Sequence, residues 1–117
     1  MLVTERRRFE RFGIPRPLRT SVGKAPAYVV DASISGIGVL HHQAVPPVGS
    51  SCRLMFHSEY GPITLECEIV RTVPAGSEAA FQSGMRIVAA DEQSEARLRT
   101  LVMGLAIPAW KRSGNSH

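Results

Sequence analysis

The chain has 117 residues, of which 44% are hydrophobic and 21% charged, and its formal net charge is +4. This length fits one domain with a real core, and the composition excludes an intrinsically disordered chain. Two cysteines, Cys52 and Cys67, are too few for a disulfide framework or a zinc site. The N-terminus lacks the apolar core of a signal peptide, and no run approaches the roughly 18 to 20 apolar residues of a membrane span, so we expect a cytoplasmic protein.

The charge is concentrated at the N-terminus. Seven basic and two acidic side chains give residues 1–24 a net charge of +5, whereas the remaining seven basic and eight acidic side chains give −1. A positive field confined to one segment favours an anionic partner at that segment. The alternative is a solvated basic tail with no partner.

Residues 1–15 are predicted to form a flexible basic arm, because they are rich in arginine and end at Gly13 and Pro15. Turn signals then recur at short spacing, which is typical of an all-β sandwich or barrel. The first three strands are expected near residues 18–22, 27–30 and 38–41. The stretch Pro46-Pro47-Val48-Gly49 breaks the pattern before the next strand.

Clear alternation predicts the next two strands, over residues 52–57 and 63–69. A two-residue loop at Glu59-Tyr60 would join them as a hairpin and place Cys52 opposite Cys67. We interpret this cysteine pair as a packing contact between reduced thiols in a reducing compartment. A last strand is expected over about residues 80–88.

The hydrophobic period then changes from two to that of a helix. Asp91 suits the N-cap, and Glu92 and Glu95 suit the first turn. One apolar stripe follows at helical spacing and should dock on the barrel: Leu98, Leu101, Val102 and Leu105. Gly104 and Pro108 mark the end of this helix, and residues 108–117 form a polar tail that we expect to fray.

Two arginines of the basic arm share one face. Arg7 and Arg11 are four residues apart, so their side chains lie on the same side of either a helical turn or an extended arm. A guanidinium group binds phosphate through two parallel hydrogen bonds and reads the O6/N7 edge of guanine. The pair therefore predicts an anionic or guanine-containing ligand.

A second polar cluster occupies the connection Asp31-Ala-Ser33-Ile-Ser-Gly36 between two strands. The Asp31 carboxylate can accept hydrogen bonds from the N1–H and N2–H groups of guanine, which an arginine cannot do. Ser33 offers a hydroxyl or backbone N–H, and Gly36 permits a positive φ or a close backbone approach. The alternative is a turn whose residues serve only local geometry.

The order RxxxR, about twenty residues, DxSxxG, further strands and a closing helix resembles the PilZ domain over roughly residues 5–105. The resemblance implies a six-stranded antiparallel β-barrel over residues 16–107 with a C-terminal helix. It also implies that Arg7, Arg11, Asp31, Ser33 and Gly36 bind the bacterial second messenger cyclic-di-GMP. An arginine before the motif, Arg6 here, implies an intercalated ligand dimer.

As a PilZ-like receptor the protein would signal to an unidentified downstream protein through ligand-induced ordering of the N-terminal arm. Two alternatives stay open: a small β-barrel that binds nucleic acid, and a PilZ-like interaction scaffold without ligand. Nucleic acid is disfavoured because few aromatic residues can stack on bases and Asp31 would repel phosphates. We expect no enzyme, because no nucleophile signature is present, and no metal or other cofactor.

Overall fold

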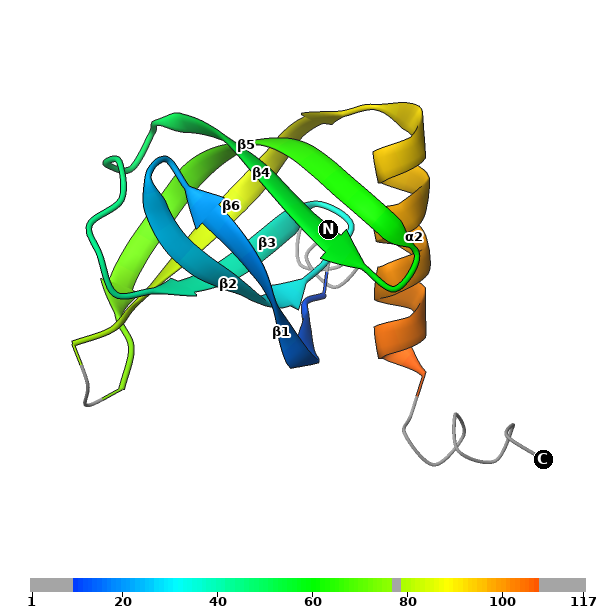
Figure 1. Ribbon diagram of the computed structural model, residues 1–117, viewed down its shortest axis with the longest axis horizontal. Coiled ribbons are helices and arrows are strands. Elements are labelled where there is room, and N and C mark those ends of the chain that lie inside the picture. Colours follow the sequence, from blue (N-terminus) through cyan, green and yellow to red (C-terminus); the bar gives the residue numbers. More distant parts are fainter. Residues whose placement is uncertain (1–9, 77–78, 108–117) are drawn as a thin grey trace, which may run out of the picture.

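The computed structural model describes residues 10–76 and 79–107, which form six strands followed by one helix (Figure 1). The strands are β1 (Phe12–Val22), β2 (Ala25–Ala32), β3 (Gly36–His41), β4 (Ser51–Ser58), β5 (Gly61–Pro74) and β6 (Phe81–Ala90). The helix is α2 (Glu92–Ala106).

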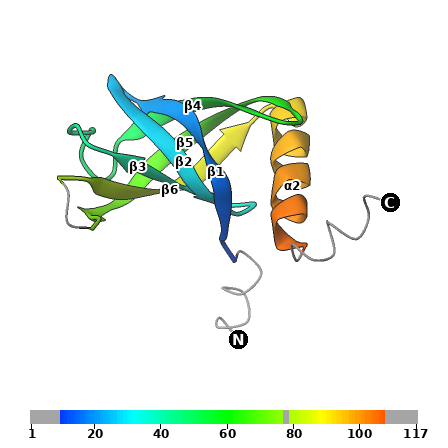
Figure 2. The same cartoon turned by 60° about the horizontal axis from the view of Figure 1, so that its bottom comes forward.

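All neighbouring strands are antiparallel and belong to one sheet with the order β1-β2-β3-β6-β5-β4. The sheet curls so that its two edge strands approach each other (Figures 1 and 2). Thr20 on β1 donates a side-chain hydrogen bond of 3.0 Å to the Met55 carbonyl on β4, which joins these edges. The predicted all-β barrel with a closing helix is confirmed as a curled half-barrel of six antiparallel strands.

The core lies inside the curl and follows the alternation read from the sequence. Its fully buried members include Leu54 on β4, Ile63, Leu65 and Ile69 on β5, and Met85 on β6. The predicted hairpin is present, because Ser58 pairs with Gly61 and Cys52 lies opposite Cys67.

Both cysteines are free thiols, as the sequence predicted. Burial, with smaller contributions from Cys52 and Glu66, raises the pKa of Cys67 to about 12. The Cys67 side chain is therefore a neutral thiol at physiological pH. Because only the thiolate is nucleophilic, it is also an unreactive core residue.

Strand β1 begins at Phe12, earlier than the sequence predicted. The predicted arm ended at Gly13 and Pro15. Pro15 and Pro17 cannot donate hydrogen bonds to a ladder. The strand accommodates them where its register with β2 shifts, between Gly13 and Leu18. Residues 12–15, which the sequence assigned to the arm, thus belong to the sheet. The rest of the predicted arm up to residue 9, and the predicted tail 108–117, lie outside the described residues.

Helix α2 begins as predicted at the N-cap Asp91, whose side chain accepts hydrogen bonds from the Ser94 backbone N–H and hydroxyl at 2.7 and 3.0 Å. The Ser94 hydroxyl in turn accepts from the Thr64 N–H at 2.9 Å, which ties the helix to β5. The apolar stripe packs on the barrel through buried Leu98, Leu101 and Val102. Among the residues that the structure describes, no helix has the length and apolar character needed to cross a membrane.

Candidate functional site

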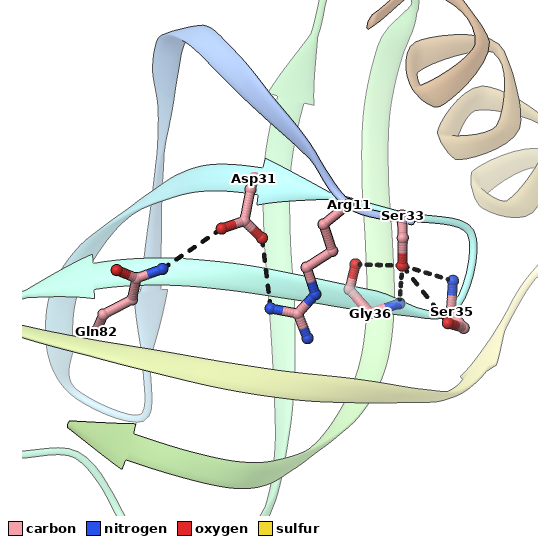
Figure 3. Close-up of polar contacts among 6 residues, drawn as sticks. All are labelled: Arg11, Asp31, Ser33, Ser35, Gly36 and Gln82. Atoms are coloured by element: carbon pink, nitrogen blue, oxygen red, sulfur yellow. Dashed lines mark hydrogen bonds and ion pairs between the residues drawn. The ribbon is translucent and has the colours of Figure 1, made fainter. Parts of the chain in front are cut away.

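The Ser33 side chain organises the turn between β2 and β3. Its hydroxyl accepts hydrogen bonds from the backbone N–H groups of Ser35 and Gly36 at 3.1 and 2.9 Å, and the Ser33 N–H donates to the Gly36 carbonyl at 2.9 Å (Figure 3). Only 1% of the Ser33 surface is exposed. The hydroxyl is thus occupied inside the turn and shapes the backbone there.

The Asp31 carboxylate lies on the outer face of the sheet, directly against Gly38 of β3. A Cβ atom added at Gly38 would lie 2.4 Å from Asp31 Oδ1, a distance that real Cβ contacts do not reach. Gln82 on β6 donates a hydrogen bond of 3.4 Å to the other carboxylate oxygen (Figure 3). Asp31 is consequently aimed across β3 while part of its side chain, 20%, stays exposed.

The Arg11 guanidinium lies on the same outer face, between Asp31 and Gly36 (Figure 3). Its Nη1 atom is 3.5 Å from Asp31 Oδ1. A Cβ atom at Gly36 would lie 3.1 Å from Arg11 Nη2 and 2.9 Å from the Met85 carbonyl, so glycine is required for this close approach. The Gly36 φ is not positive, and of the two reasons proposed for this glycine the close approach is the one observed.

The structure therefore brings together four of the six residues singled out from the sequence, although they come from separate segments: Arg11, Asp31, Ser33 and Gly36. Arg6 and Arg7 lie outside the described residues. Arg11 directly precedes β1, so the described chain enters the sheet at this site.

A family model for the PilZ domain matches residues 5–104 of this chain. The chain belongs to the PilZ domain family. This confirms the resemblance inferred from the two motifs, and it covers the described barrel together with most of the helix.

Several solved structures share the fold of this domain at low sequence identity. YcgR from Escherichia coli in complex with cyclic-di-GMP is 17% identical, with a TM-score of 0.73 over 96% of this chain and 51% of that one. The isolated PilZ domain of YcgR with cyclic-di-GMP is 19% identical, with a TM-score of 0.66 over 94% of this chain and 98% of that one. The motility inhibitor MotI (DgrA) of Bacillus subtilis is 14% identical, with a TM-score of 0.68 over 94% of this chain and 53% of that one.

This PilZ chain thus spans about half the length of YcgR and of MotI. No curated protein sequence matches it significantly.

Three residues of the candidate site were not singled out from the sequence: Gly38, Gln82 and Gly84. A glycine inside a strand often marks a close backbone approach, and this signal was available for Gly38 and Gly84. Gln82 carries no comparable signal, because its position beside Asp31 depends on the pairing of β2, β3 and β6.

The site presents the Asp31 carboxylate, which accepts hydrogen bonds, and the Arg11 guanidinium, which donates them. Both groups lie over strand glycines, which have no side chains to cover this part of the sheet. Such a surface can bind a flat ligand that has both donor and acceptor edges and carries negative charge. No group of three potential metal ligands occurs among the described residues.

Proposed function

We propose that this PilZ domain binds cyclic-di-GMP on the outer face of its sheet, between Asp31 and the arginines of the N-terminal segment. The observation that carries the proposal is the Arg11 guanidinium, held 3.5 Å from the Asp31 carboxylate over Gly36. It joins the two motifs, twenty residues apart in the chain, into one surface. The cyclic-di-GMP complexes of the similar YcgR structures support it.

The roles follow from the chemistry of each group. Asp31 accepts from the N1–H and N2–H groups of one guanine, and Arg11 donates to a phosphate or to the guanine O6/N7 edge. Arg7 supplies a second guanidinium. Ser33 and Gly36 act indirectly, because one shapes the turn and the other leaves room for Arg11.

The Arg11–Asp31 ion pair can open to admit the ligand. The two side chains are 40% and 20% exposed, and an exposed ion pair contributes only about 0–1 kcal/mol. A hydrogen bond to a charged group contributes about 1.5–3 kcal/mol. Contacts with the ligand therefore outweigh the contact between the two side chains.

We further propose that the ligand orders the N-terminal arm and thereby changes the surface that a downstream protein recognises. Hydrogen exchange of residues 1–11 measures this: saturating cyclic-di-GMP should slow their exchange. Arg6 is proposed to support a second, intercalated ligand, so that Arg6→Ala would reduce the stoichiometry from two ligands to one. A receptor of this kind catalyses no reaction.

Isothermal titration with cyclic-di-GMP tests the proposal. We expect the wild type to bind, Asp31→Ala to abolish detectable binding, and Arg11→Ala to weaken it roughly 10- to 100-fold. Arg53→Ala is the matched control, because Arg53 pairs with Glu66 away from the site. Binding of a single-stranded oligonucleotide that cyclic-di-GMP cannot displace would instead indicate a nucleic-acid-binding barrel.

A further inference from the structure

A row of directly opposed residues crosses the sheet through the proposed site. Asp31 pairs with Gly38, Gly38 with Gly84, and Gly84 with Arg71. Residues that lie opposite each other on antiparallel strands present their side chains on the same face. Asp31 and Arg71 are therefore the two charged ends of one row on the outer face, separated by two glycines that have no side chain.

Two β-bulges place these charged residues on the outer face. Val29 and Ile69 are fully buried, and strict alternation would also point Asp31 and Arg71, two positions later, into the core. Each ladder instead shifts its register just before the charged residue, so that Val30 and Val70 are the extra residues. Bulges commonly re-aim a side chain beside a functional site, and here two of them act on one row.

Arg71 has no ion pair or hydrogen bond to any residue that the structure describes, and its side chain is exposed. The other arginines of β4 to β6 are engaged, since Arg53 pairs with Glu66 and Arg86 with Glu68. Arg71 also borders an open hollow whose remaining lining residues are Arg11, Val70 and Gly84. Two guanidinium groups therefore border one hollow, and Asp31 neutralises only that of Arg11.

We propose that Arg71 is a further ligand-binding residue, which binds a phosphate of cyclic-di-GMP at the end of the row opposite Asp31. This inference rests on the proposed function. The row spans three strand spacings, or about 14 Å, which suits an extended ligand with two phosphates better than a single base. A guanidinium binds phosphate through two parallel hydrogen bonds, which a lysine cannot reproduce.

Titration of Arg71→Ala and Arg71→Lys with cyclic-di-GMP tests the inference, with Arg53→Ala as the control for lost charge. We expect Arg71→Ala to bind about 10- to 100-fold more weakly than wild type, and Arg71→Lys to lie between them. Because Arg71 has no described partner, the thermal midpoint of the ligand-free protein should change by no more than about 3 °C.

The outcomes separate the two proposals. Wild-type binding that Asp31→Ala abolishes, but that Arg71→Ala leaves within about twofold, overturns the role of Arg71 alone. An equal loss in Arg53→Ala and Arg71→Ala overturns it as well, because the effect would then come from net charge. If the wild type does not bind cyclic-di-GMP, the proposed function fails and the role of Arg71 fails with it.

Discussion

At Gly38 the lack of a side chain determines where the Asp31 carboxylate can lie. A Cβ atom there would come within 2.4 to 2.5 Å of both carboxylate oxygens. The carboxylate can move toward solvent, so relief of this overlap displaces Asp31 without opening the core. The position of the carboxylate that we propose to bind guanine is thus set by a residue on the neighbouring strand.

We therefore expect Gly38→Ala to weaken cyclic-di-GMP binding at least about tenfold, while the protein stays folded. Gly13→Ala is the matched control, because Gly13 also pairs with Asp31 and a Cβ atom there meets nothing within 4 Å. Titration calorimetry and thermal unfolding of both variants check this. Wild-type affinity in Gly38→Ala would show that Asp31 does not need this position.

Among the elements, the N-terminal turn of α2 is stabilised by its N-cap residue, Asp91. Hydrogen bonds from the Ser94 backbone N–H and hydroxyl hold the pKa of Asp91 below its ordinary value of 3.8. A carboxyl group whose folded-state pKa is lowered stabilises the fold above its unfolded-state pKa. That stabilisation is lost as the pH falls through the folded-state pKa.

Asp91→Asn should separate capping from titration. The Asn side-chain oxygen can still accept from the Ser94 N–H, but it does not titrate, so the stability advantage of the wild type should shrink as the pH falls below about 4. Asp91→Ala should be less stable than both at neutral pH. Urea unfolding followed by circular dichroism at several pH values measures these differences. A wild-type advantage over Asp91→Asn that does not change with pH would contradict the interpretation.

For the whole molecule, the charge distribution sets how the ligand is attracted. Residues 1–24 carry a net charge of +5 and the remainder −1, and the proposed ligand brings two phosphates to this positive segment. Added salt shortens the screening length from about 10 Å at 0.1 M to about 3 Å at 1 M. We expect the affinity for cyclic-di-GMP to fall over this range.

A variant that carries both Arg16→Gln and Arg19→Gln tests the contribution of the general field. These arginines are exposed and lie outside the two motifs, so their removal should lower the affinity less than tenfold and reduce its salt dependence. Calorimetry at both salt concentrations measures the effect. Equal affinities of the wild type at low and high salt would indicate that stacking and neutral hydrogen bonds dominate binding.

The sequence alone determined those parts of this protein whose cause is local. Alternation predicted β4 and β5, because the face of a side chain in a regular strand depends only on its position. The two-residue loop at Glu59-Tyr60 then predicted that Cys52 lies opposite Cys67. The N-cap and apolar stripe of α2 were equally readable, since capping and helical spacing act within a few residues. The two motifs predicted the family.

Only the tertiary structure decided what depends on pairing between distant segments. The ladder with β2 carries β1 through residues 12–15, where the sequence predicted an arm. The row that ends at Arg71 exists because bulges shift two ladders, and a bulge is defined by the partner strand as well as by its own residues.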